Sequence, residues 1–182
     1  ISRRPKLSDD EWRGYGKRLT GLAERMAGFG VGMAFHHHMG TIVETDAEVD
    51  RLMAVTGPAV GLLYDTGHSA FSGGDPVALL KRHVKRVVHV HCKDARKDLL
   101  DKARAKDESF MQAVLDGVFT VPGDGFIDYP RILSMLHDAG YAGWLVCEAE
   151  QDPGKAHPLT YARLGFSNLV RMALQAGFTV SP

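Results

Sequence analysis

Three short, mainly apolar runs, each ending in a residue that can bind metal, constrain the fold of this 182-residue chain most strongly. They are residues 60–64 before Asp65, residues 87–90 before His91, and residues 144–147 before Glu148. A strand that is buried on both faces of a parallel sheet has this kind of continuous apolar sequence. We therefore expect three parallel strands with polar side chains at their carboxyl ends.

Segments with helical spacing of apolar residues separate these runs. Ser8 and Glu11 have the spacing of a capping box ahead of the first such segment. Two further apolar segments, 31–35 and 118–121, complete an alternation of five strands with helices. This order predicts an α/β fold with a parallel sheet and helices outside it.

The alternation favours a (β/α)8 TIM barrel of which this chain covers roughly the C-terminal five β/α units. A complete barrel typically has ~250 residues, and the first residue is Ile1, so we expect a processed or truncated piece of a longer chain. We expect residues 1–182 to form a single domain, with the charged segment 95–116 as a helical insertion or lid. An open doubly wound sheet is the alternative, but no predicted strand is followed by a glycine-rich phosphate loop.

Charge and cysteine usage limit the partners and the compartment. The formal net charge is zero, which argues against nucleic acid or a membrane surface as the partner, because both favour a basic face. Cys92 and Cys147 lie in apolar runs, and we expect both to be reduced. The chain has no apolar run of transmembrane length and no signal-peptide pattern, so we expect a cytoplasmic protein.

Asp65, His91 and Glu148 form the candidate metal site. Carboxylate oxygens and an imidazole nitrogen suit a hard or borderline divalent ion, and neighbouring strands of a barrel bring such ends together. The alternative for each residue alone is a satisfied polar group at the rim of the sheet. Because all three end apolar strands, the metal hypothesis is favoured.

Longer motifs resemble the xylose-isomerase-like TIM-barrel superfamily and, within it, the inosose dehydratase family. The superfamily motifs are Asp-Thr-Gly-His at 65–68, the runs 89–94 and 122–128, and the run 140–148. The Phe-His-His-His-Met-Gly-Thr run at 35–41 is similar to the dehydratases, as are 48–53 and 148–153. The resemblance covers the chain from about Val31 to its end.

This resemblance implies an activity, a cofactor and a ligand set. The implied reaction is loss of water from 2-keto-myo-inositol (scyllo-inosose), a cyclic polyol ketone, to give a cyclohexane-1,2-dione. The implied cofactor is Mn²⁺ or Co²⁺, with glutathione as a further requirement. Asp65, His91 and Glu148 match metal ligands of the superfamily. His68 matches a substrate-contacting histidine, and Arg96 lies near the place of a substrate-binding arginine.

The strand at 31–35 departs from the superfamily pattern. Many relatives have a metal-binding glutamate where this chain has His36. Either His36 is the fourth ligand, or the site is rearranged and His38 takes that part, with substrate contact as its other role. Side chains alternate along a strand, so His36 and His38 share a face and His37 points away.

Eliminating water beside a ketone needs a polarised carbonyl, a base for the α-proton and an acid for the departing hydroxyl. A metal supplies the first, and His, Lys or buried Glu side chains can be tuned for the others. The catalytic candidates are His68, Lys93 and Glu150, and the sequence leaves open which takes the α-proton. Lys93 and Glu150 each lie two residues beyond a proposed ligand and so share its face.

Three functions compete. The first is the metal-dependent dehydratase, and the second is a metal-dependent sugar or keto-acid isomerase or epimerase of the same superfamily. The third is an inactive barrel fragment or a binding module. Superfamily members are often dimers or tetramers, so the resemblance also implies a homo-oligomer.

Overall fold

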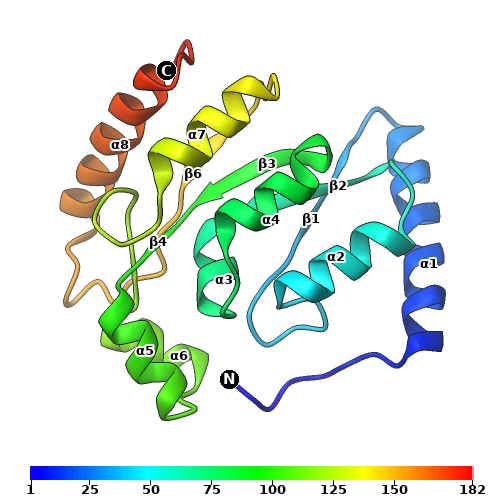
Figure 1. Ribbon diagram of the computed structural model, residues 1–182, viewed down its shortest axis with the longest axis horizontal. Helices are drawn as coiled ribbons and strands as arrows, with labels where there is room; N and C mark the ends of the chain where they lie inside the picture. The colour runs from blue at the N-terminus through cyan, green and yellow to red at the C-terminus, as the bar shows by residue number, and fades with distance from the viewer. Residues whose placement is uncertain (182) are drawn as a thin grey trace.

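The computed structural model describes residues 1–181 and contains an open four-stranded parallel sheet (Figure 1). The strands are β1 (Met33–His36), β2 (Val60–Asp65), β3 (Val87–Cys92) and β6 (Leu145–Cys147), in the order β1-β2-β3-β6. All three strand pairs are parallel. Since parallel strands end at the same edge of a sheet, this order brings the polar strand ends side by side.

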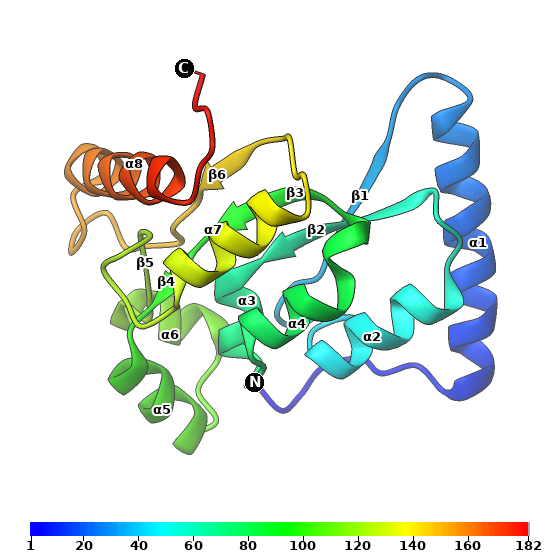
Figure 2. The same cartoon turned by 45° about the horizontal axis from the view of Figure 1, so that its top comes forward.

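Helices cover one side of the sheet (Figure 2). The larger ones are α1 (Asp9–Ala27), α2 (Asp46–Val55), α4 (Pro76–His83), α7 (Tyr129–Asp138) and α8 (Pro158–Gln175). Each packs against the next in that order. A short helix α3 (Thr66–Phe71) follows β2 directly, and a single 3₁₀ turn (Val84–Arg86) precedes β3. None of the helices in residues 1–181 is both long and apolar enough to span a membrane.

Local sequence signals fix where the helices begin. Ser8 and Glu11 form the expected capping box at α1, and Thr45 and Glu48 form a second one at α2. Each cap satisfies backbone N–H groups that a helix start leaves free, which is worth ~1 kcal/mol. Asp75 caps α4 in the same way, through the amides at the helix start.

The core lies between the sheet and the helices. Leu62 and Tyr64 of β2 are fully buried, together with Leu52 of α2 and Leu79 of α4. The Tyr64 hydroxyl donates a 2.7 Å hydrogen bond to the Pro76 carbonyl oxygen, so the buried oxygen has a partner. The core therefore holds β2 in the middle of the sheet and fixes the direction of its end.

The expectation of a fifth parallel strand at 118–121 is wrong. The segment contains only β5 (Phe119–Thr120), which pairs antiparallel with β4 (Asp94–Ala95) in a separate two-stranded sheet. A short apolar run does not reveal its pairing partner. In this chain the run packs against residues of the segment 95–116, and the main sheet of the described residues has four strands.

The segment 95–116, for which we expect a helical insertion or lid, contains two helices. They are α5 (Lys97–Ala105) and α6 (Phe110–Asp116). Leu100, Ala113 and Phe119 pack with Met39 and Phe71 in a second apolar cluster. The insertion is thereby attached to the loop after β1 and to α3, both of which carry histidines of the predicted site.

Candidate metal centre

Asp65, His91 and Glu148 converge at the carboxyl edge of the sheet. The His91 Nδ1 atom lies 3.0 Å from Glu148 Oε2 and 3.5 Å from Asp65 Oδ2. One ligand atom from each residue lies within 4.8 Å of those of the other two. The register pairs Asp65 with His91 and Cys92 with Cys147, so the convergence follows from the strand pairing.

Asp65 is the most enclosed member of the group. Its carboxylate is fully buried, and Oδ1 accepts a 2.9 Å hydrogen bond from the His68 amide as the N-cap of α3. Burial alone would raise the pKa of Asp65, but the hydrogen bond from His36, the adjacent His91 ring and the nearby charges hold it well below its usual range. Oδ2 is therefore a charged oxygen directed into the site.

These donors fit a divalent cation. Two buried atoms, His91 Nδ1 and Glu148 Oε2, face each other at 3.0 Å without forming a hydrogen bond. A cation between them would satisfy both atoms, and one imidazole with two carboxylates is a donor set for a borderline ion. The contacts with Asp65 and Glu148 raise the pKa of His91 to about 9, so a bound cation has to displace a proton from this ring.

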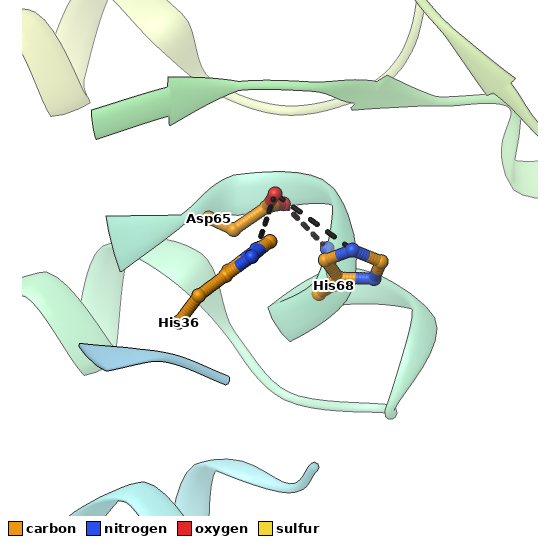
Figure 3. Close-up of side chains that lie close together, drawn as sticks. All are labelled: His36, Asp65 and His68. Atoms are coloured by element: carbon orange, nitrogen blue, oxygen red, sulfur yellow. Dashed lines mark hydrogen bonds and ion pairs between the residues drawn. The ribbon is translucent and has the colours of Figure 1, made fainter. Parts of the chain in front are cut away.

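His36 lies beside Asp65, as Figure 3 shows. Its Nε2 atom is 3.3 Å from Asp65 Oδ2, and its ring centroid is 4.9 Å from that of His91. His38 lies beside Glu150, with its Nε2 atom 3.6 Å from Glu150 Oε1. His36 thus lies with the three predicted ligands, whereas His38 lies with the predicted catalytic residues.

Lys93 joins the two sets of residues. Its side chain is fully buried, and Nζ lies 2.9 Å from Glu148, 2.8 Å from Glu150 and 3.5 Å from Asp65. Burial lowers the pKa of a lysine, but the carboxylates of Asp65 and Glu150 outweigh it and raise the pKa of Lys93. The site therefore contains a fixed ammonium among three carboxylates.

Gly67 makes room for that lysine. A Cβ atom at this position would lie 2.6–2.8 Å from the β-, γ- and δ-carbons of Lys93. The glycine of the Asp-Thr-Gly-His run thus allows the lysine stem to pass against α3. Thr66 holds the same junction, since its hydroxyl contacts the Lys93 carbonyl at 2.8 Å and the Tyr129 hydroxyl at 2.7 Å.

His68 is neutral and fully buried. Burial lowers its pKa to about 3, despite the nearby Asp65 carboxylate. Lys93 Nζ lies 3.1 Å from His68 Nε2, so Nε2 accepts from the ammonium and Nδ1 carries the ring proton. That buried Nδ1 has no hydrogen-bond partner within the described residues. Figure 3 shows the ring turned toward Asp65 from the first turn of α3.

Arg96 has a structural set of contacts. Its guanidinium donates to the Gly117 carbonyl at 2.8 Å, to Thr120 at 3.0 Å and to Asp124 at 2.8 Å. These contacts tie the insertion to the loop after β5. Substrate contact by Arg96 stays a prediction.

Two residues of the site were not singled out from the sequence. His37 is fully buried, and its Nε2 accepts a 3.4 Å hydrogen bond from the Asp65 amide, so it contacts the backbone of β2 next to the predicted ligand. Asp94 is buried and accepts from the amides of Ala95, Gly123, Gly125 and Ile127. Its place directly after Lys93 was visible in the sequence, but its four partners were not.

Comparison with known proteins identifies the family. The model of the xylose isomerase-like TIM barrel family matches residues 2–169. The chain belongs to this family. The predicted TIM-barrel fold class is thereby confirmed, and the four parallel strands of this xylose isomerase-like chain form part of such a barrel.

The relatives of this xylose isomerase-like chain confirm the resemblance to inosose dehydratases. The rhizopine catabolism protein MocC of Rhizobium meliloti is 70% identical over 100% of this chain and 56% of its own length. Inosose dehydratases of Bacillus licheniformis and Lactiplantibacillus plantarum are 46% and 50% identical, over 97% and 88% of this chain and 59% and 54% of their own lengths. The chain thus spans somewhat more than half the length of these curated relatives.

A solved structure shows the same fold at lower identity. The IOLI protein with a bound zinc atom superposes with a TM-score of 0.72 at 20% identity, covering 99% of this chain and 62% of that chain. At this identity the likeness concerns the fold.

Proposed function

We propose that this chain carries the catalytic centre of a metal-dependent dehydratase that removes water from 2-keto-myo-inositol. The observation that carries the proposal is the cluster of Asp65, His91 and Glu148 around which Lys93 and Glu150 are placed. The dehydratases that are 46–50% identical to this chain support the substrate. The substrate is a proposal, because the chain spans just over half of their length.

Asp65, His91, Glu148 and His36 would hold the ion. When bound, a divalent ion supplies Lewis acidity that polarises the ketone. We propose Mn²⁺ or Co²⁺, whose preferences suit two carboxylates with imidazole, and the bound zinc of the IOLI protein supports a divalent ion in general. A requirement for glutathione rests on the family resemblance alone.

The remaining side chains differ in whether they hold a proton. Lys93 Nζ is protonated, and the Glu150 carboxylate 3.6 Å away raises the pKa of His38 and favours its protonated form. Glu150 is ionised, because its contacts with His38 and Lys93 outweigh burial and lower its pKa, and His68 is neutral. Lys93 and His38 can therefore give a proton to the departing hydroxyl, whereas Glu150 can accept the α-proton. The Nε2 atom of His68 already accepts from Lys93, so we propose that His68 assists by holding the ammonium in place. We propose His38, His68 and Arg96 as the substrate contacts.

An assay of the purified chain with Mn²⁺ or Co²⁺ and scyllo-inosose tests the proposal. We expect the absorbance of the dione product to appear with the wild-type chain and with His157→Ala, which changes an exposed histidine at the start of α8. The absorbance should be lost in His91→Ala. Turnover of a ketose without any dione would support the isomerase or epimerase instead.

The non-catalytic alternative is tested in the same preparation. Metal analysis of the wild-type chain should find a bound divalent ion that is lost in His91→Ala. If the wild-type chain holds no ion and turns over neither substrate, the chain is an inactive fragment or a binding module.

A further inference from the structure

An aromatic cluster links the insertion to the two substrate-side histidines. Phe110, the first residue of α6, has its ring centroid 5.5 Å from that of His38 and 5.9 Å from that of His68. The same ring lies 5.7 Å from Phe71 and 5.9 Å from Phe119. Phe110 therefore lies between the apolar centre of the insertion and the polar site.

The exposure of these rings differs. Phe71 and Phe119 are fully buried, whereas Phe110 is half-buried and the side chain of His38 is 32% exposed. Of these three phenylalanine side chains, Phe110 is the one that keeps exposed surface, and it lies next to the partly exposed imidazole of His38. His38 and His68 in turn lie 3.6 and 3.7 Å from Glu150, one of the groups proposed to move a proton.

The position of Phe110 is fixed by its helix. The Ser109 hydroxyl caps α6 by accepting from the Gln112 amide at 3.1 Å. Ala113 and Val114 on the next turn are buried against the insertion. A ring held in this way does not have to be ordered when a ligand binds, which favours its use as a binding surface.

We propose that Phe110 forms the apolar wall of the substrate site and selects ring-shaped polyol ketones over open-chain ones. A six-membered ring with equatorial hydroxyl groups exposes C–H bonds on both of its faces, and such a face can pack on an aromatic ring. An open-chain ketose has no rigid face of this kind. Sites for small molecules commonly combine such an apolar wall with a few polar groups that fix orientation. This inference rests on the proposed function and adds the element that recognises the ring.

Steady-state kinetics of Phe110→Ala tests the wall. Since the wall contacts both the bound substrate and the transition state, we expect KM for scyllo-inosose to rise about 10-fold or more with little change in kcat. Phe110→Tyr keeps the ring and should have a KM close to that of the wild-type chain. Met111 is an exposed neighbour on α6, and Met111→Ala should leave KM unchanged. An unchanged KM in Phe110→Ala, or an equal rise in Met111→Ala, would overturn the wall.

A binding measurement separates this inference from the proposed function. Saturation-transfer NMR with scyllo-inositol, a cyclic polyol without a ketone, should show transfer to the ring C–H protons in the wild-type chain and a strong loss in Phe110→Ala. Phe110→Leu preserves the apolar packing of the insertion and should still lose most of the transfer. If scyllo-inositol shows this dependence while scyllo-inosose is not turned over, the dehydratase proposal fails and the wall stands. Absence of transfer in the wild-type chain would overturn the wall.

Discussion

Replacing Gly67 by alanine tests how the lysine is delivered to the site. The new methyl group would lie 2.6 Å from the γ-carbon of Lys93, where ordinary contact begins at 3.4 Å, so the stem has to move by about 0.8 Å. A shift of this size would lengthen the hydrogen bonds of Nζ with Glu150 at 2.8 Å and His68 at 3.1 Å beyond hydrogen-bonding range. The substitution therefore acts on the buried ammonium and not only on the helix.

The magnitudes decide the sign of the effect. Exchanging glycine for alanine inside a helix gains up to about 1 kcal/mol. Forcing a methyl group into a packed site costs ~1–3 kcal/mol, and a fully buried ammonium with weakened pairing adds to the cost. We expect Gly67→Ala to lower the free energy of unfolding by about 2 kcal/mol, or about 4–8 °C in Tm for a chain of this size.

Gly21→Ala is the matched control. Gly21 also lies within a helix, α1, but a Cβ atom there would meet nothing within 4 Å. This variant should be stabilised by up to about 1 kcal/mol. Urea unfolding of the two variants beside the wild-type chain gives the comparison, and equal stabilisation of both would refute the account of Gly67 and Lys93.

Three further predictions concern stability. Asp94→Ala leaves four backbone N–H groups between β4 and α7 without their buried acceptor, so urea unfolding should show a loss of roughly 3–5 kcal/mol in the free energy of unfolding; a loss below ~1 kcal/mol would contradict this role of Asp94. Tyr64→Phe removes one buried hydrogen bond and should cost ~1 kcal/mol, and a neutral effect in thermal unfolding would argue against that bond. The contacts of His91 with Asp65 and Glu148 should make the stability of the metal-free chain depend on pH. The stabilisation that they give is complete between pH 4.5 and 6.5. It is lost as pH rises through about 9 or falls through about 2, because the pKa of His91 is raised and that of Glu148 lowered. Unfolding in chelator across this range should show the alkaline loss in the wild-type chain and not in His91→Asn.

The sequence predicted which candidate ligands lie side by side, because strand ends are easy to locate. The apolar runs that end at Asp65, His91 and Glu148 form neighbouring parallel strands, and their register brings the three side chains together. Alternation along the strand predicted that His36 and His38 share a face, and these two side chains lie beside Asp65 and Glu150. Local periodicity was sufficient for these predictions, because the sheet preserves it.

Other features depend on contacts between distant segments. The segment 118–121 resembled a strand of the main sheet, but its two-residue strand pairs with β4, and no local signal specifies that partner. The position of Phe110 against His38 depends on how the insertion docks on α3. The guanidinium of Arg96 is likewise directed by carbonyl groups and side chains more than 20 residues away.

Metal binding by the purified chain tests the central claim most directly. Equilibrium dialysis against Mn²⁺ or Co²⁺, followed by elemental analysis, should find one ion per wild-type chain. Asp65→Asn removes the charged, buried oxygen that faces His36 and His91 and should abolish binding. Asp138→Asn, at an exposed carboxylate of α7, should bind like the wild-type chain. Equal ion content in Asp65→Asn and the wild-type chain, or no ion in either, would contradict the assignment of this cluster as a metal centre.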